Sequence, residues 1–241
     1  SLDEQKRIAN ILDQADALRQ KRKQSLQLLD DFLNASFLHL FGDPLRNDKK
    51  WPVKKLGEVS SVKIGPFGSL LHREDYIANG IPLVNPTHIV NKKICPDFNF
   101  TISDKKQEEL RQYLLKEGDI VLARRGEIGR CGLVTKKEDG YLCGTGSLFV
   151  RPQKALNPIY LVYLISSKSM RKSLENSSVG VTMKNLNAGI VENTRIIHPD
   201  KNLQDKFEAI VSKTDSLKDS MGNNIEQMDN EFNALTQRYF G

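Results

Sequence analysis

The cysteines, histidines and one glycine-rich segment are the residues of this sequence that could bind a metal ion or a cofactor. Cys95, Cys131 and Cys143 form no C-x-x-C pair and are odd in number, which argues against a disulfide framework and a structural zinc site. None of the four histidines has a Cys or another His at metal-ligand spacing. Residues 143–147, Cys-Gly-Thr-Gly-Ser, have the spacing of neither a dinucleotide loop nor a phosphate loop. We therefore expect a tight turn there, and no metal or cofactor.

Asn157-Pro158-Ile159-Tyr160 is the segment closest to a catalytic motif. It nearly matches the N-P-P-Y motif of adenine methyltransferases, which must hold a base flipped out of the helix. The second proline is missing, and no glycine-rich loop follows a strand in a way that would bind S-adenosylmethionine. A helix that begins at proline explains the same residues. The sequence therefore favours a chain without catalytic activity of its own.

The charge distribution points to a polyanion as partner. The net charge of the chain is +6, yet residues 43–200 carry 25 basic and 17 acidic residues, so the ends contribute no positive excess. Each phosphate that a basic surface neutralises releases condensed counterions, which favours binding to DNA. A merely soluble basic surface is the alternative. No apolar run approaches the ~18 residues that cross a bilayer, and no signal peptide is visible, so we expect a cytoplasmic protein without membrane contact.

Four polar segments of the basic region are candidate DNA-binding loops, because function tends to lie on loops held by a rigid scaffold. Their candidate residues are Lys63, Phe67, Ser69, His72 and Arg73; Asn85, Thr87 and His88; Arg124, Arg125 and Arg130; and Thr182, Lys184, Asn185 and Asn187. Arginine can bind guanine or a phosphate, and an asparagine amide can pair with adenine. A solvated charge or a turn explains any single one of these residues equally well, so the prediction concerns the loops as a group.

Two similar segments at the ends of the chain must position these loops. Residues 2–41 lack proline and glycine, and their apolar residues recur at steps of three and four, as in a long amphipathic or coiled-coil helix. An ungapped shift of 199 positions aligns residues 2–42 with residues 201–241, which indicates an internal repeat. The predicted pairing residues are Ile8, Ile11, Leu18, Leu29, Phe32, Phe207, Ile210, Leu217 and Met228. We expect the two helices to form an antiparallel coiled coil, or to pair with a second chain.

The region between the helices is predicted to be a compact α+β domain. Short β-rich runs alternate with Gly, Pro and Asn turns. The predicted strands are 59–64, 81–84, 119–123, 131–134, 146–151 and 195–198, and the predicted helices are 103–115 and 158–175. The sequence thus predicts three parts: a long helix over residues 1–42, a globular mixed α/β domain over 43–200, and a second long helix over 201–241.

The order of these motifs resembles a known family. The chain reads LDEQKRI, LFG, WPVKKLGEV, NGIPLV, LKEGDIVLARRGEIGRCG, NPIYLVYLISS, SVGVTMKNLN, IIHP and RYFG. Each motif alone is weak, but their order together with the repeated helix resembles one target-recognition domain of a type I restriction-modification specificity subunit, flanked by its central and distal conserved helices. The resemblance covers essentially the whole chain.

The resemblance implies a sequence-specific DNA-binding subunit that reads one half of a bipartite site in double-stranded DNA. It implies that the helices act as a spacer and bind the methyltransferase subunits, while methylation and cleavage belong to the methyltransferase and restriction subunits. In the family two such units form one subunit, so this chain is expected to be a shortened piece or a natural half-size subunit, and a homodimer in the latter case. Two alternatives remain: a DNA adenine methyltransferase that uses NPIY to hold its base, and a coiled-coil scaffold that binds a protein.

Overall fold

The chain folds as two compact units in the computed structural model, which describes residues 2–180 and 185–240. The first unit contains Ser1–His39 and Ala209–Gly241, and the second contains Leu40–Glu208. Helices α1 (Leu2–Phe41) and α7 (Lys201–Phe240) provide the first unit, while the end of α1 and the start of α7 belong to the second. Of the helices in residues 2–180 and 185–240, none combines the length and the apolar composition that a transmembrane span needs. The predicted combination of an α+β domain with two long helices is confirmed.

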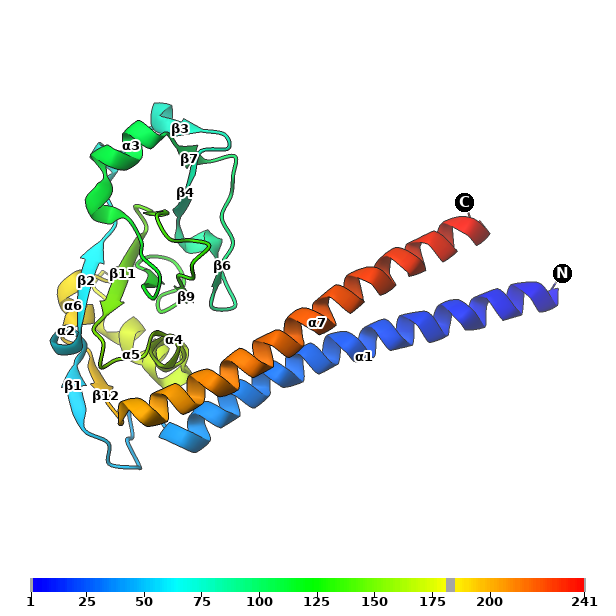
Figure 1. Ribbon diagram of the computed structural model, residues 1–241, viewed down its shortest axis with the longest axis horizontal. Coiled ribbons are helices and arrows are strands. Elements are labelled where there is room, and N and C mark those ends of the chain that lie inside the picture. Colours follow the sequence, from blue (N-terminus) through cyan, green and yellow to red (C-terminus); the bar gives the residue numbers. More distant parts are fainter. Residues whose placement is uncertain (1, 181–184, 241) are drawn as a thin grey trace. The chain divides into compact units, whose positions relative to one another are not determined.

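Helices α1 and α7 pair in antiparallel orientation (Figure 1). Two ion pairs fix their register, Arg19 with Asp229 and Lys218 with Asp30. Both pairs have residue numbers that add to the same value, as antiparallel neighbours must. The long helices predicted from the repeat therefore pair within one chain.

The contact seam between the helices is a regular heptad pattern. Its positions on α1 are Ile8, Leu12, Ala15, Arg19, Arg22, Leu26, Leu29 and Leu33, all buried or partly buried. The corresponding positions on α7 are Val211, Thr214, Lys218, Met221, Ile225, Met228 and Phe232. Steps of three and four residues keep one side of each helix facing its partner, and the shift of 199 positions maps one seam onto the other.

The structure corrects four of the predicted pairing residues. Ile8, Leu29 and Met228 lie on the seam, and Phe207 is fully buried against Phe41, the last residue of α1. The four that lie off the seam, with exposed fractions of 38 to 51 %, are Ile11, Leu18, Phe32 and Leu217. Ile210, which the repeat aligns with Ile11, is partly exposed.

The error has a physical cause, because several seam positions are polar and two of them are charged residues held in ion pairs. Arg19 and Lys218 point their charged groups at carboxylates of the other helix, so they remain on the seam as ion pairs. An assignment that follows apolar residues alone selects the neighbouring leucines, Leu18 and Leu217, which lie one residue to the side.

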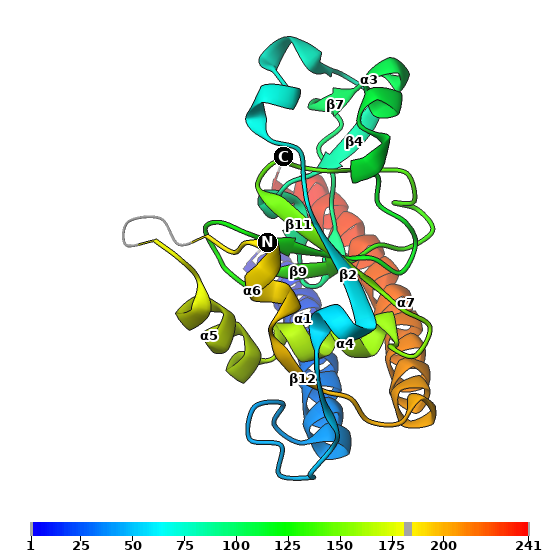
Figure 2. The same ribbon diagram turned by 90° about the vertical axis from the view of Figure 1, so that its left-hand side faces the viewer.

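The second unit is built on two four-stranded sheets. The larger sheet has the order β2-β11-β8-β9 and is antiparallel throughout; its strands are Ser60–Ile64, Ser147–Pro152, Ile120–Ala123 and Cys131–Leu133. The smaller sheet has the order β10-β4-β7-β3, and its strands are Leu142–Cys143, Ile81–Val84, Thr101–Ile102 and Tyr76–Ile77. Figure 2 shows β2, β11 and β9 across the middle of this unit, with α3, β4 and β7 above them.

Short elements complete the second unit. Two strand pairs connect segments outside the large sheets: β1 (Val53–Lys55) with β12 (Arg195–Ile197), and β5 (Ile89–Val90) with β6 (Lys93–Ile94). The helices are α2 (Leu56–Val59), α3 (Asp104–Glu109), α4 (Pro158–Ser166), α5 (Lys168–Ser177) and α6 (Ala188–Glu192). Helix α4 packs on β8 and β9, and six of its residues are buried.

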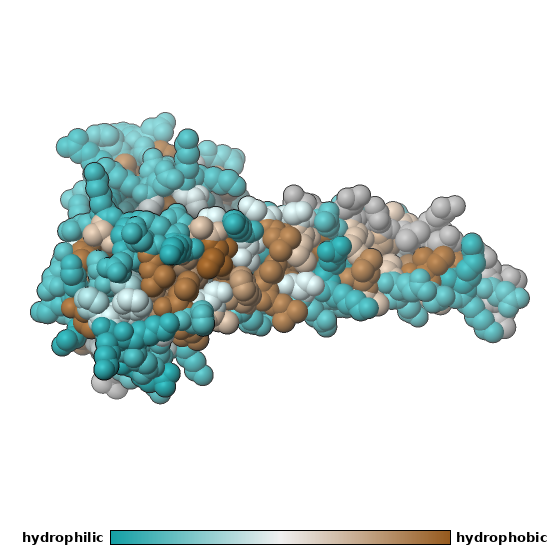
Figure 3. Space-filling model, turned by 60° about the horizontal axis from the view of Figure 1, so that its bottom comes forward, coloured by the Kyte–Doolittle hydropathy of each residue, from teal (hydrophilic) through white to brown (hydrophobic). Residues whose placement is uncertain are grey.

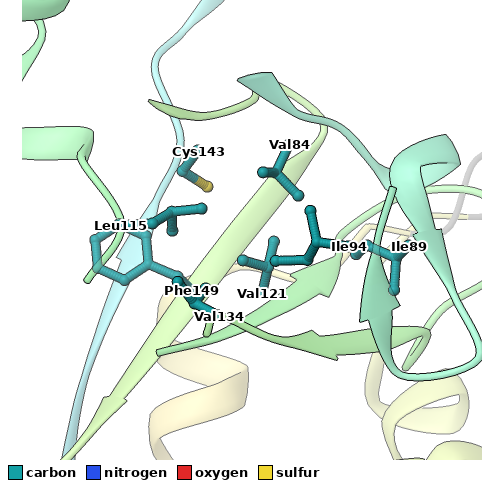
Figure 4. Packing of buried hydrophobic residues seen from close by; sticks show 8 residues of the cluster. All are labelled: Val84, Ile89, Ile94, Leu115, Val121, Val134, Cys143 and Phe149. Carbon is teal, nitrogen blue, oxygen red and sulfur yellow. The ribbon is translucent and has the colours of Figure 1, made fainter. Parts of the chain in front are cut away.

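One hydrophobic cluster joins the two sheets (Figure 4). It contains Val84 and Cys143 of the smaller sheet, and Val121 and Phe149 of the larger one, all fully buried. Burying an apolar side chain of this size contributes about 1.5–3 kcal/mol relative to leaving it exposed. The ends of the strands that leave this cluster are therefore held firmly.

Both predicted helices of this unit differ from the structure at their ends. The first ends at Glu109 instead of Leu115, and a 3₁₀ turn over Arg111–Tyr113 follows. The second is interrupted at Ser167, whose extended backbone and side-chain oxygen, which accepts a hydrogen bond from the Met170 N–H, cap α5. Serine satisfies a free N–H at a helix start, so this cap starts a new helix inside a continuous helical pattern.

Candidate nucleic-acid interface

Backbone hydrogen bonds tie the candidate loops together at one end of the two sheets. Gly65, after β2, donates to the carbonyl of Ser147, and Gly144, after β10, donates to the carbonyl of Val84 at the end of β4. The N–H of Arg124, after β8, donates to Gly146, and the carbonyl of Arg124 accepts from Leu186. The bases of the first three loops therefore meet around the turn at residues 143–147, and the described part of the fourth is joined to the third through Leu186.

The turn at residues 143–147 was not among the predicted DNA-binding segments. Its glycines permit very close packing: a Cβ added to Gly144 would lie 2.1 Å from Oδ1 of Asn85, and a Cβ added to Gly65 would lie 2.1 Å from the carbonyl oxygen of Gly144. No side chain fits in either place. The spacing of Gly144 and Gly146 did predict a tight turn, but only the tertiary structure places it at the centre of the loops.

The first loop, residues 63–73, presents polar and apolar groups to solvent. All five of its candidate residues are exposed: Lys63, Phe67, Ser69, His72 and Arg73. Asp75 accepts a hydrogen bond from the backbone N–H of His72 and pairs with Lys106 at 3.2 Å. These contacts hold the pKa of Asp75 below its ordinary value, the His72 hydrogen bond first and Lys106 after it. The carboxylate thus fastens the end of this loop.

The second loop, residues 85–88, is more enclosed. Thr87 is exposed, whereas Asn85 and His88 are partly buried. The Nδ1 atom of His88 lies 2.7 Å from the carbonyl oxygen of Leu83, so this ring is held by the loop's own backbone. Thr87 is the residue of this loop with the most access to a ligand.

The arginines of the third loop differ in their surroundings. Arg124 is 8 % exposed, and its Nε donates to the carbonyl of Leu186 at 2.9 Å. Burial lowers the pKa of Arg124, and the neighbouring positive charge of Arg125 adds to the effect. Arg125 is exposed, and no ion pair joins it to another residue that the structure describes. Arg125 is therefore the better placed of the two to contact DNA.

Arg130 is partly neutralised by its neighbours. Glu127 pairs with Arg130 and, at 2.7 Å, with Arg171 of α5, while Nη1 of Arg130 donates to the carbonyl of Pro86. The two arginines hold the pKa of Glu127 below its ordinary value. This network connects the third loop to the second loop and to α5.

The fourth loop is described only in part. Asn185 pairs with Val179 through two backbone hydrogen bonds, and its Oδ1 is buried without a hydrogen-bond partner among the described residues. Asn187 is exposed but accepts a hydrogen bond from Ile190, so it caps α6. Thr182 and Lys184 lie outside the described residues.

The NPIY segment has a structural role. Oδ1 of Asn157 accepts hydrogen bonds from the first turn of α4, and its amide donates to Asp205 and Glu208 at the start of α7. Asn157 is 1 % exposed and Tyr160 is 0 % exposed, with the Tyr160 hydroxyl bonded to the carbonyl of Ile197. A flipped base needs an accessible ring and a free amide, and neither is available here.

Two of the three cysteines, Cys131 and Cys143, are buried, whereas Cys95 is exposed. Burial raises the pKa of the Cys131 thiol to about 12 and moves that of Cys143 further above its ordinary range. The thiolate is the reactive form of cysteine, so Cys131 and Cys143 are packing residues. Across residues 2–180 and 185–240, no three His, Cys, Asp or Glu side chains are grouped to hold a metal ion.

The paired helices offer a second candidate surface within the first unit. The exposed apolar residues Leu18, Leu28 and Phe32 lie on α1, and Leu217 lies on α7. In Figure 3, brown hydrophobic residues interrupt the hydrophilic surface of the long helices. Leu18 and Leu217 are equivalent in the repeat and are 50 % and 51 % exposed. The helix pair thus presents the same apolar feature on both helices.

Known proteins share this architecture. The chain is 26 % identical over 230 residues to the type I restriction enzyme MjaIX specificity subunit of Methanocaldococcus jannaschii, a match that covers 88 % of this chain and 52 % of the relative. The HsdS subunit from Thermoanaerobacter tengcongensis has a similar fold, with a TM-score of 0.60, 15 % identity, and coverage of 97 % of this chain and 56 % of that one.

The S subunit of a type I restriction-modification system from M. genitalium is similar in the same way. Its TM-score is 0.62 and its identity 16 %, and the match covers 99 % of this chain and 61 % of that one. The chain spans about half the length of the curated relatives it matches. The model of the type I restriction modification DNA specificity domain matches residues 48–228, more than half of the chain. The chain is therefore a member of the type I restriction-modification specificity family.

Proposed function

We propose that the second unit reads one half of a bipartite site in double-stranded DNA. The observation that carries this proposal is the convergence of the loops: segments from five places in the sequence meet at one end of the sheets. The meeting point combines a free arginine at 125, amides, hydroxyls and closely packed glycine backbone. Such groups can bind phosphates for position and base edges for specificity.

We also propose that the helix pair acts as a spacer and binds the methyltransferase subunits, while other subunits carry out the chemistry. Forty helical residues span about 60 Å at 1.5 Å per residue, which corresponds to about 17 base pairs. A rod of this length can hold two readers over separated half-sites. Its exposed leucines, Leu18 and Leu217, would contact methyltransferase subunits, and the restriction subunit would join through the assembled complex. We propose that this assembly works in the cytoplasm.

The proposal can be tested by selecting bound duplexes from a random-sequence pool, with and without the methyltransferase subunit. We expect an enriched short half-site and affinity that falls steeply with salt. Recovery of unrelated sequences after several rounds would contradict specific reading. Calorimetry should detect no S-adenosylmethionine binding by the chain alone, and micromolar binding would contradict the proposed absence of catalysis.

The proposed homodimer must compete with the pairing inside the chain. The seams that would join two copies are already occupied by α1 and α7 of one chain. A dimer through the same faces therefore requires two chains to exchange a helix. Light scattering at increasing concentration distinguishes a monomer from such an exchanged dimer.

A further inference from the structure

Phe67 stands at the tip of the first loop with little protein around it. Its side chain is 66 % exposed, the largest exposed fraction among the aromatic residues that the structure describes as exposed. Among the described residues, Phe67 makes no ring contact, whereas Phe100, which is also exposed, packs edge-on against Tyr76. A Cβ on the next residue, Gly68, would find no atom within 4 Å. The ring thus lies in open surroundings.

The base of the same loop is rigid. Gly65 packs directly on the carbonyl of Gly144 and donates to Ser147. Pro66 is buried, and Leu71 on the other side of the tip is 6 % exposed. Phe67 itself is extended, and its carbonyl accepts from Leu70 to close a 3₁₀ turn over Gly68–Leu70. The exposed ring is therefore carried on a firmly held support.

A ligand that covers this ring gains free energy, because apolar surface is then removed from water. Lys63 near the end of β2, and His72 and Arg73 after the tip of the loop, are exposed and suit a phosphate backbone. Many minor-groove-binding proteins insert apolar side chains between base pairs of a duplex, and aromatic rings stack on unpaired bases without regard to sequence. The chemistry around Phe67 matches such a wedge.

We propose that Phe67 inserts into the base stack of the bound duplex and unstacks one step. This inference rests on the proposed DNA-binding function. The ring supplies a contact that neutralises no phosphate, so its share of the affinity is insensitive to salt. The cationic residues around it supply the share that depends on salt.

The test uses residues 1–241 and a duplex that the wild-type chain selects from a random pool. Binding is measured over a series of salt concentrations for wild type, Phe67→Ala and Phe67→Trp. We expect Phe67→Ala to bind about tenfold to a hundredfold more weakly, with an unchanged slope of log affinity against log salt. Phe67→Trp should retain most of the affinity. Phe32→Ala, which removes a half-exposed ring from the first unit, is the matched control and should bind as wild type does.

Insertion itself is measured by replacing the adenines of that duplex one at a time with 2-aminopurine. Wild type should raise the fluorescence at one step, and Phe67→Ala should not. Equal affinity of wild type and Phe67→Ala would overturn the inference. The inference would also be overturned if Phe67→Ala lost affinity but the wild-type complex showed no rise in 2-aminopurine fluorescence at any position, since Phe67 would then contact a groove. Failure of the wild-type chain to bind any duplex would overturn the proposed function instead.

Discussion

Arg19 of α1 and Asp229 of α7 form an ion pair with 2.5 Å between Nε and Oδ1, and the sequence repeat maps this pair onto Lys218 and Asp30. A shift of 199 positions converts Arg19 into Lys218 and Asp30 into Asp229, so the two bridges are equivalent by an internal two-fold relation. The axis crosses the helix pair between residues 24 and 25 of α1. A repeated helix in antiparallel orientation thus gives the first unit an approximate symmetry of its own.

The Arg19–Asp229 pair should couple the two helices measurably. A double-mutant cycle of Arg19→Ala and Asp229→Ala is expected to give a coupling of about 0.5–1 kcal/mol, since both side chains are partly exposed. The cycle for Lys218 and Asp30 should give a similar value because the pairs are equivalent. Urea unfolding measures both cycles. A coupling near zero in both would mean that the register does not depend on these pairs.

The position of the seam can be tested with two leucines of one helix. Leu33 is 0 % exposed and Leu18 is 50 % exposed. We expect Leu33→Ala to lower the free energy of unfolding by about 2–5 kcal/mol and Leu18→Ala by less than about 1 kcal/mol. Denaturant titration provides both values. If Leu18→Ala were more destabilising than Leu33→Ala, the seam would run through Leu18, as the sequence pattern predicted.

Substitution of two adjacent arginines should affect DNA binding in one case and protein stability in the other. Arg125→Ala removes an exposed cation and is expected to reduce the salt slope of DNA binding by about one while leaving stability unchanged. Arg124→Ala removes the buried donor to Leu186 and should lower the free energy of unfolding by about 1–3 kcal/mol. Thermal unfolding and salt-dependent binding are measured for both variants. An unchanged slope for Arg125→Ala would exclude this residue from the interface.

The close packing at the centre of the loops predicts that alanine substitution of two glycines affects stability differently. Gly65→Ala would place a methyl group 2.1 Å from a backbone oxygen, so the loop must shift and both stability and DNA affinity should fall. Overpacking of this kind costs about 1–3 kcal/mol. Gly68→Ala has open space and should change stability by less than about 1 kcal/mol. Thermal unfolding of both variants, compared with wild type, tests this packing.

The capping amide of Asn157 should contribute to the pH dependence of stability. Hydrogen bonds from Lys201 and then from Asn157 hold the pKa of Asp205 below its ordinary value of 3.8. A carboxyl whose folded pKa is depressed stabilises the fold above its unfolded pKa, and this contribution is lost as the pH falls through the folded value. Asn157→Ala should therefore lower stability at neutral pH and weaken its decline below about pH 4. Urea titrations at several pH values would show an unchanged pH profile if Asn157 had no effect on Asp205.

The sequence-based prediction of the domain between the helices was accurate where local patterns determine structure. The strand at Ile81–Val84 was predicted with its observed ends, and α4 begins at the predicted Pro158. Apolar runs and a proline in the first helical turn are local signals. The end of α3 and the break at Ser167 were missed, because a 3₁₀ turn and an internal cap interrupt a helical pattern that the sequence continues.

By itself, the sequence determined the two repeated helices, the basic domain between them and the set of loops that could bind DNA. Composition, periodicity and the shift of 199 positions are properties of the chain alone. Only the tertiary structure decided which side of each helix forms the seam. Arg19 and Lys218 are tolerated on the seam because each forms an ion pair with a carboxylate more than 180 positions away. It also buried Arg124, exposed Arg125 and placed residues 143–147 among the loops, because burial and close packing depend on neighbours that are distant in sequence.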